Sequence, residues 1–206
     1  MSTMETRALG EVATILRGTV PSRPTDSEDG SPFFGISEIS AGGVAPLRRV
    51  DLDDGATPGA QTTATARVGP VILEPGDVAV ALMGNIGQSA LVAPRHAGAV
   101  LGRECALIRP GLADISGAWI YVWTQSAHFR DQVLRHTSGT TMPRLSYRAL
   151  TDLTIPVASG ERQRATEALL EEFDAALRKL GQVQSYLTEL RTLEIELVLA
   201  DMNESG

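Results

Sequence analysis

Apolar and polar positions along the chain follow two different periodicities. In the first half, short apolar runs alternate with turns rich in glycine and proline, a pattern typical of β-strands. Residues 78–83 are apolar at successive positions and predict a strand buried on both faces. The glycine-containing turn at 84–87 leads into 89–92, which predicts a hairpin partner, and 106–108 predicts a further strand.

The N-terminal third is less regular. Residues 9–16 predict a short strand or a turn of helix, residues 33–39 predict a strand, and residues 47–52 predict another. Residues 25–32 are polar, with several acids and a glycine, and predict an exposed loop. Residues 53–66 are rich in glycine, threonine and alanine and also predict a loop.

Helical spacing dominates the second half. Ser116 is a suitable N-cap for a helix that we expect to run to about His136. A much longer helical pattern covers residues 159–202, where eight of ten heptad seam positions are apolar. Residues 193–197 alternate between apolar and polar positions, so the last part of this pattern is also compatible with a strand.

Together these elements predict an α+β fold. A mixed, β-rich domain is expected over residues 1–157, followed by a long coiled-coil-type helix over residues 158–206. The apolar stripe of that helix is longer than a small domain can cover, so we expect it to pair with a second copy. Packing of the helix along its own domain is the alternative. The expected interface residues are Phe173, Leu180, Val183, Leu187 and Leu190.

The sequence predicts a cytoplasmic protein without a membrane segment. No apolar stretch approaches the roughly 18 residues of a membrane span, and residues 1–9 lack the apolar middle of a signal peptide. The single cysteine, Cys105, excludes an internal disulfide and fits a reducing compartment.

Charge is unevenly distributed along the chain. The net charge is −7, yet residues 95–150 carry seven basic and three acidic side chains and form a basic island between two acidic segments. The basic residues comprise 17 arginines and one lysine. Genomic base composition explains such a bias, and the suitability of guanidinium groups for phosphate and guanine is the functional alternative.

Familiar catalytic patterns are absent from the sequence. There is no phosphate-binding Walker loop and no Gly-x-Ser-x-Gly motif, and the three histidines have no metal-ligand spacing with Cys105. We expect each histidine to lie on the surface or in a loop. The sequence therefore predicts no catalytic residue, no metal site and no cofactor, and an enzyme with an unfamiliar site is the weakest of three functional hypotheses.

The order of several short motifs resembles a known family. Leu-Gly-Glu-Val within residues 9–18, Leu-Glu-Pro-Gly-Asp-Val at 73–78 with Gly-Asn-Ile-Gly at 84–87, the segment 138–156, and Glu-Arg-Gln at 161–163 follow one another along nearly the whole chain. In this order they resemble a target recognition domain and helical spacer of the specificity subunits of type I restriction-modification systems. A complete subunit has two of each, and this sequence, which has no internal repeat, is similar to half of one.

The resemblance implies a non-catalytic subunit that binds a specific sequence in double-stranded DNA. It also implies a DNA methyltransferase subunit as a partner, with a restriction or translocase subunit as a further possible partner. Two copies joined through their helices would form a homodimer that reads an interrupted palindrome. The competing hypothesis is a protein-interaction module on the same scaffold, which the acidic net charge favours.

Candidate DNA contacts lie in polar loops. Arginines there suit phosphate, carboxamides suit adenine, and the loop after residue 138 lies in the basic island. Each kind of candidate has a structural alternative. The early arginines are then solvated side chains, the asparagine is a turn residue beside Gly84, and the loop after residue 138 closes the domain onto the helix. The candidates are Arg17 and Arg23 for phosphate, Asn85 and Gln88 for adenine, and Thr140, Thr141 and Arg144 in the later loop.

Overall fold

The computed structural model describes residues 5–19, 26–41, 47–52, 69–139 and 143–204. The loop predicted at residues 53–66 lies outside these ranges.

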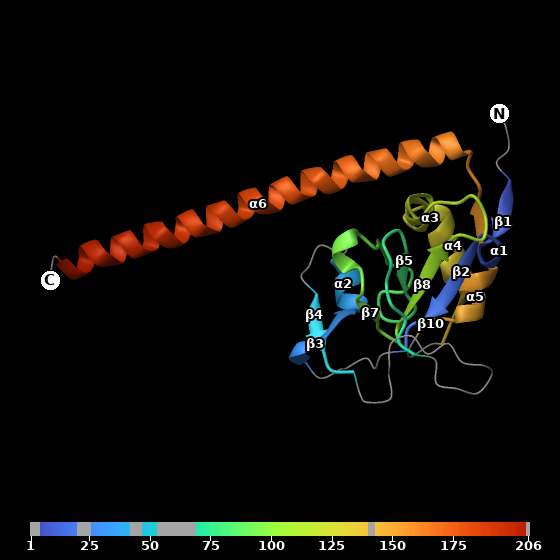
Figure 1. Ribbon diagram of the computed structural model, residues 1–206, viewed down its shortest axis with the longest axis horizontal. Coiled ribbons are helices and arrows are strands. Elements are labelled where there is room, and N and C mark those ends of the chain that lie inside the picture. Colours follow the sequence, from blue (N-terminus) through green and yellow to red (C-terminus); the bar gives the residue numbers. More distant parts are fainter. Residues whose placement is uncertain (1–4, 20–25, 42–46, 53–68, 140–142, 205–206) are drawn as a thin grey trace. The chain divides into compact units, whose positions relative to one another are not determined.

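The chain divides into two compact units, residues 1–164 and residues 165–206 (Figure 1). The first unit combines strands with short helices, and the second belongs to one long helix, so the predicted α+β fold class is confirmed. The elements are β1 (Thr6–Ala8), α1 (Leu9–Val12), β2 (Ala13–Arg17), β3 (Asp26–Phe34), α2 (Ile36–Ser40), β4 (Arg48–Val50), β5 (Val78–Ala81), β6 (Ser89–Leu91), η1 (Pro94–His96), β7 (Val100–Leu101), β8 (Cys105–Pro110), α3 (Gly117–Thr124), α4 (Ala127–His136), β9 (Thr137–Ser138), β10 (Arg144–Leu145), α5 (Tyr147–Asp152), β11 (Thr154–Pro156) and α6 (Gly160–Glu204).

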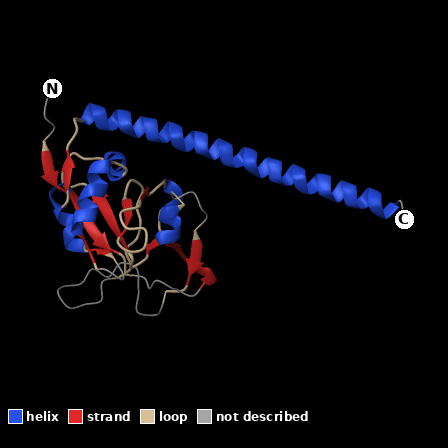
Figure 2. Ribbon diagram, turned by 180° about the vertical axis from the view of Figure 1, so that it is seen from behind, coloured by secondary structure: helices blue, strands red, loops and turns tan. Residues whose placement is uncertain are grey.

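A four-stranded antiparallel sheet in the order β2-β8-β5-β6 forms the centre of the first unit (Figure 2). The predicted buried strand corresponds to β5, its hairpin partner to β6 and the next strand to β8, so all three predictions are confirmed. A three-stranded sheet, β4-β3-β7, lies beside them in the fold, and two short pairs, β1-β11 and β10-β9, complete the strands that the structure describes.

Both faces of the four-stranded sheet are covered by apolar side chains. Val80 and Ile108 belong to the same buried cluster as apolar residues of α3, α4 and α5. Ala79 and Leu107, which alternate with them along the strands, belong to a second cluster with Phe34 and residues of β7. Because successive strand residues point to opposite faces, burial on both faces requires the continuous apolar run that the sequence shows.

The helix predicted to run from Ser116 to about His136 is two helices. The Ser116 hydroxyl accepts a hydrogen bond from the Trp119 N–H at 3.2 Å, as expected for an N-cap. A second serine, Ser126, accepts from the Phe129 N–H at 3.2 Å and starts α4. The predicted single helix is therefore wrong, because a new cap at Ser126 allows the chain to turn between α3 and α4.

Two predictions in the N-terminal third are also wrong. The loop expected at residues 25–32 is most of strand β3, which pairs with β4 and, in parallel, with β7. The strand expected at residues 33–39 ends at Phe34, and α2 begins at Ile36. The buried Glu38 carboxylate accepts the Gly35 N–H at 2.8 Å, which satisfies a donor at the start of this helix.

The motif Leu-Glu-Pro-Gly-Asp-Val has a structural role. Asp77 is buried and accepts two hydrogen bonds from Arg109, from Nε at 3.0 Å and from Nη2 at 2.8 Å. The hydrogen bond to Asp77 and the attraction of Asp77 and Glu74 raise the pKa of Arg109 above its ordinary value, against the effect of burial. Gly76 precedes Asp77 with φ of +90°, a conformation that favours glycine.

His96 lies in the short connection η1 between β6 and β7, which fits the predicted surface or loop position only in part. Its ring is buried against Phe34, with the ring centroids 5.1 Å apart. Its Nδ1 accepts the Ala93 N–H at 3.1 Å. Within the described part of the chain, no group of three or more His, Cys, Asp or Glu side chains is arranged to hold a metal ion.

Helix α6 spans 45 residues, from Gly160 to Glu204, so the predicted long helix is confirmed and the alternative of a strand at residues 193–197 is wrong. Its first turn belongs to the first unit. There the buried Gln163 side chain donates to the carbonyl oxygens of Asp114 and Ala158 at 2.8 and 2.9 Å and accepts the Ser116 N–H at 2.7 Å. None of the described helices has the length and apolar character needed to cross a membrane.

Candidate functional site

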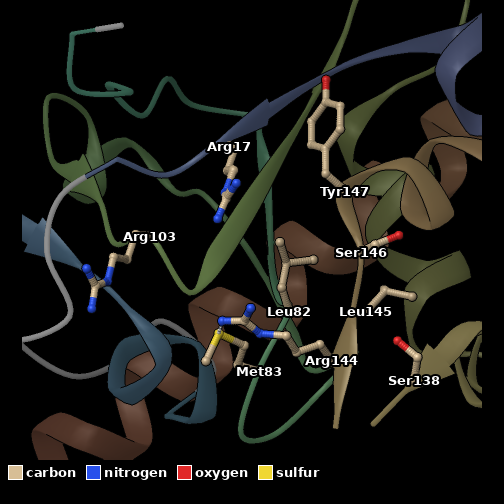
Figure 3. Close-up of a pocket in the computed structure, with 9 residues that line it drawn as sticks. All are labelled: Arg17, Leu82, Met83, Arg103, Ser138, Arg144, Leu145, Ser146 and Tyr147. Carbon is tan, nitrogen blue, oxygen red and sulfur yellow. Dashed lines mark hydrogen bonds between the residues drawn. The ribbon is translucent and has the colours of Figure 1, made fainter. Parts of the chain in front are cut away.

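Three arginines from distant parts of the chain line one pocket of the first unit. Arg17, Arg103 and Arg144 surround a cavity of about 230 Å³ (Figure 3). The other described lining residues are uncharged, so none of them is a carboxylate. They are Leu82, Met83, Ser138, Leu145, Ser146 and Tyr147.

Close approach of two backbone segments brings Arg17 and Arg103 together. Arg17 is the last residue of β2 and lies opposite Ala106 of β8. The Gly18 N–H then donates to the Cys105 carbonyl at 3.1 Å. A Cβ at Gly18 would overlap the backbone carbonyl of Gly102, so the loop that carries Arg103 can approach only a glycine at this position.

Arg144 is positioned by two backbone pairings. It lies opposite Ser138 in the β9-β10 pair and forms an isolated antiparallel bridge with Met83, which follows β5. The next residue, Leu145, is buried and donates its N–H to the Leu82 carbonyl at 3.0 Å. The Arg144 side chain extends over Met83, where Nη2 lies 3.1 Å from the thioether sulfur (Figure 3).

The positive charge of the pocket is largely uncompensated. Neither Arg17 nor Arg144 forms an ion pair with any described residue, and Arg103 contacts Glu104 only at 3.9 Å, with its own side chain mostly exposed. By contrast, the Tyr147 hydroxyl donates to the Ile15 carbonyl at 2.6 Å, and the Ser146 hydroxyl caps α5. The hydroxyls of Tyr147 and Ser146 serve the fold, whereas the guanidinium groups of Arg17 and Arg144 have no acidic partner among the described residues.

This chemistry suits binding of an anion. A guanidinium group presents fixed N–H donors that match phosphate oxygens. Among its described lining residues the pocket has no histidine, cysteine or carboxylate, and the only cysteine in the sequence, Cys105, is buried in the core. The arrangement therefore supports recognition of phosphate groups.

A second polar group lies in the loop between β5 and β6. After Met83, which lines the pocket, this loop carries Asn85 and Gln88, both exposed. Asn85 Nδ2 donates to Ser40 Oγ at 2.9 Å, and Ser40 Oγ donates to Gln88 Oε1 at 3.0 Å. Ser40 ends α2, so one hydroxyl joins two carboxamides from a separate element.

The structure thus brings the predicted residues together in two groups. Arg17 and Arg144 share the pocket, and Asn85 and Gln88 share a hydroxyl. Arg23, Thr140 and Thr141 lie outside the described residues. Two contributors, Arg103 and Ser40, were not predicted from the sequence. Arg103 stands in the basic island, which was a usable signal, whereas nothing local distinguishes Ser40 from other surface serines.

The aromatic side chains of α3 serve the core instead of the site. Trp119 Nε1 donates to the Pro156 carbonyl at 2.8 Å. Trp123 is buried, and its ring meets that of Phe129 edge to face, with the centroids 4.8 Å apart. Trp123 is therefore not available to stack on a base.

Helix α6 presents a second surface. The five predicted interface residues are all more than half exposed, and neighbouring apolar residues extend the same stripe. Among the α6 residues whose burial is described, the exposed large apolar ones are Leu169, Phe173, Leu177, Leu180, Val183, Tyr186, Leu187 and Leu190.

Comparison with known proteins identifies related sequences and folds. A family model described as type I restriction modification DNA specificity domain matches residues 1–185. The fold is similar to the type I restriction-modification S subunit from M. genitalium, with a TM-score of 0.59 and 16% identity over 87% of this chain and 41% of that one. It is also similar to the HsdS subunit from Thermoanaerobacter tengcongensis, with a TM-score of 0.55 and 21% identity over 87% of this chain and 39% of that one.

A third similar structure comes from work on complex assembly and conformational transition of the type I restriction-modification system. Its TM-score is 0.56 and its identity 23%, over 92% of this chain and 43% of that one. This chain therefore spans about two fifths of the length of the structures it matches. No curated protein matches the chain.

Proposed function

The chain belongs to the family of type I restriction-modification DNA specificity domains, and from this premise we propose that it reads a specific sequence in double-stranded DNA. The family's role is recognition, and catalysis belongs to other chains. In this proposal residues 1–157 form the target recognition domain and residues 158–206 form the spacer.

The observation that carries the proposal is the arginine pocket. Three arginines line one cavity, and none of its described lining residues is a carboxylate, an arrangement that suits a phosphate backbone. The local field explains how an acidic chain would bind DNA, because Arg103 and Arg144 lie in the segment of residues 95–150 that carries excess positive charge. In the same proposal, Arg23, Thr140 and Thr141 contribute from neighbouring segments.

Base reading is assigned to the loop that carries Asn85 and Gln88. Carboxamides pair with the major-groove edge of adenine through one donor and one acceptor. The loop follows directly from Met83, which lines the arginine pocket, so phosphate and base contacts would lie next to each other on one surface. Phosphate contacts would fix the register while the carboxamides select the sequence.

Helix α6 is proposed to pair with the helix of a second copy. The exposed apolar stripe repeats at heptad positions, and a helix of 45 residues spans roughly 68 Å. Paired helices would hold two recognition domains at a fixed separation and select a bipartite site with two half-sites. Phe173, Leu180, Val183, Leu187 and Leu190 would form the interface between them.

A DNA methyltransferase subunit is the proposed partner, and a restriction or translocase subunit is a further proposed one. One of the similar structures belongs to an assembled type I system, which supports this choice. A partner would also supply positive surface that a chain of net charge −7 lacks.

A protein-interaction module is the second candidate function. The acidic net charge and the exposed stripe of α6 favour it, since both would serve binding to another protein. It makes no use of the arginine pocket or of the paired carboxamides.

Selection from a random pool of duplex oligonucleotides separates the two functions. The full chain is incubated with the pool, alone and together with a methyltransferase subunit, and bound DNA is sequenced. A DNA specificity subunit enriches one bipartite sequence in at least one condition. If neither condition enriches any sequence, DNA specificity is excluded and the interaction module remains.

A further inference from the structure

The loop between β5 and β6 has a rigid backbone. The Gly87 N–H donates to the Ala81 carbonyl at 2.9 Å, and the Gln88 N–H donates to the Asn85 carbonyl at 3.0 Å. Gly84 and Gly87 have φ of +67° and +81°, which favours glycine at both turning points. The backbone therefore holds Asn85 and Gln88 at fixed positions.

Ser40 also fixes the side chains of these two residues. Its hydroxyl accepts one N–H of Asn85 at 2.9 Å and donates to Gln88 Oε1 at 3.0 Å. Ser40 lies 45 positions before Asn85 and 48 positions before Gln88 in the sequence, so the contact depends on the packing of α2 beside the β5-β6 hairpin. Each carboxamide loses rotational freedom before any ligand binds.

The hydrogen bonds to Ser40 leave a defined set of groups unused. Asn85 keeps Oδ1 and one N–H, and Gln88 keeps its NH₂ group and one acceptor position on Oε1. Reversing the direction of both hydrogen bonds leaves the same result. Each carboxamide still keeps at least one donor and one acceptor for a ligand.

On the basis of this geometry, we propose that Ser40 is a positioning residue that presents Asn85 and Gln88 to adenine in the major groove. Adenine offers the N7 acceptor and the N6 donor, which match one donor and one acceptor of a carboxamide. Guanine offers two acceptors, N7 and O6, so a carboxamide matches only one of them. This inference rests on the proposed DNA-binding function and adds the residue that orients the two carboxamides for adenine.

A purely structural role for these contacts explains less. All three side chains are exposed, and hydrogen bonds at an exposed site add little stability because water offers equal partners. Apolar contacts already hold the loop, since Ile86 packs against the buried cluster that contains Phe129 and Val133. The Ser40 hydroxyl instead orients the two carboxamides.

The test compares base preference among variants in the random-pool selection. The full chain is used as wild type, Ser40→Ala, Ser40→Thr, and a double variant with Asn85→Ala and Gln88→Ala. We expect the double variant to lose the preference for adenine at one or two positions by about fivefold or more. Ser40→Ala is expected to lower the same preference about threefold, and Ser40→Thr, which keeps the hydroxyl, to restore it.

Thermal unfolding of each variant shows whether the domain remains folded, and the other positions of the selected site serve as internal controls. Unchanged adenine preference in Ser40→Ala, or equal weakening at every position of the site, would overturn the positioning role. A wild-type site without adenine would overturn the assignment of the base. If the wild-type chain selects no sequence, the proposed function fails, and this inference fails with it.

Discussion

The first unit (residues 1–164, the globular unit) buries apolar residue types that helix α6 exposes. Phe129 in α4 is fully buried, whereas Phe173 in α6 is 58% exposed. The globular unit buries most of its large apolar side chains in clusters on both faces of a sheet, with a few scattered exceptions such as Leu134. On α6, large apolar side chains form an exposed stripe along the helix.

This difference separates stability from association. A buried side chain contributes to folding of its own chain, while an extended exposed apolar stripe marks a surface that another molecule covers. The globular unit is therefore expected to fold without a partner, and α6 to require one to bury its stripe.

Matched truncations of two phenylalanines test this difference and have the largest expected effect. Phe129→Ala opens a cavity in the core and should lower the free energy of unfolding of the globular unit by about 3–5 kcal/mol. Phe173→Ala should change it by less than about 1 kcal/mol. Urea unfolding followed by tryptophan fluorescence measures both, and equal losses would contradict the division between the regions.

A charge in the apolar stripe should dissociate the paired helices. Leu187→Asp places a carboxylate in the proposed interface of both copies and should weaken dimerisation on the order of 100-fold. Gln182→Asp adds the same charge outside the heptad seam and is the matched control. Sedimentation velocity should show monomers for the first variant and dimers for the control, while an unchanged dimer for Leu187→Asp would exclude this seam.

Within the globular unit, exposed arginines should contribute differently to DNA affinity, depending on whether they line the pocket. Arg144 lines the pocket, and Arg148, only four residues later, has a side chain that is 93% exposed and lies outside it. Arg144→Ala should lower DNA affinity about tenfold, and Arg148→Ala less than about threefold. Fluorescence anisotropy with a labelled duplex measures both affinities. Equal losses would show that general charge, and not the pocket, governs binding.

The smallest expected effect concerns Cys105. Burial, followed by the charges of Glu104 and Glu38, raises the pKa of this thiol from 9.0 to about 12. The folded protein therefore keeps the proton that the unfolded chain loses above pH 9, so stability is unaffected below pH 9 and falls between pH 9 and about 12. Thiol labelling at pH 8 should be slow in the folded protein and fast in urea. Rapid labelling without urea would show that the core opens.

Local signals explain which elements were predictable. The continuous apolar run of β5, the Ser116 cap and the heptads of α6 each lie within a short stretch of sequence, and each was predicted correctly. Most of strand β3 is polar in sequence, and the strand forms because β4 and β7, which come later in the chain, pair with it. Helix α2 depends on the burial of Glu38, which a local pattern does not indicate.

The candidate site shows the same limit. Residue type and loop position made Arg17, Arg144, Asn85 and Gln88 candidates, but they did not indicate which of these residues lie together. The pocket exists because Gly18 permits close approach of the loop that carries Arg103, and the carboxamide pair exists because α2 places Ser40 against the hairpin. Such long-range contacts belong to the folded structure, and no single segment encodes them.

The most direct measurement of DNA recognition by this chain is the salt dependence of binding. Affinity for the selected duplex is measured for the wild type and for a variant with Arg17→Ala and Arg144→Ala. The salt concentration is varied from about 50 to about 200 mM, a range over which binding through phosphate contacts weakens strongly. We predict a linear fall of log affinity with log salt concentration, with a slope about 1.8 smaller in magnitude for the double variant, as expected for the loss of two phosphate contacts. Identical slopes for the two proteins would contradict phosphate binding in the arginine pocket.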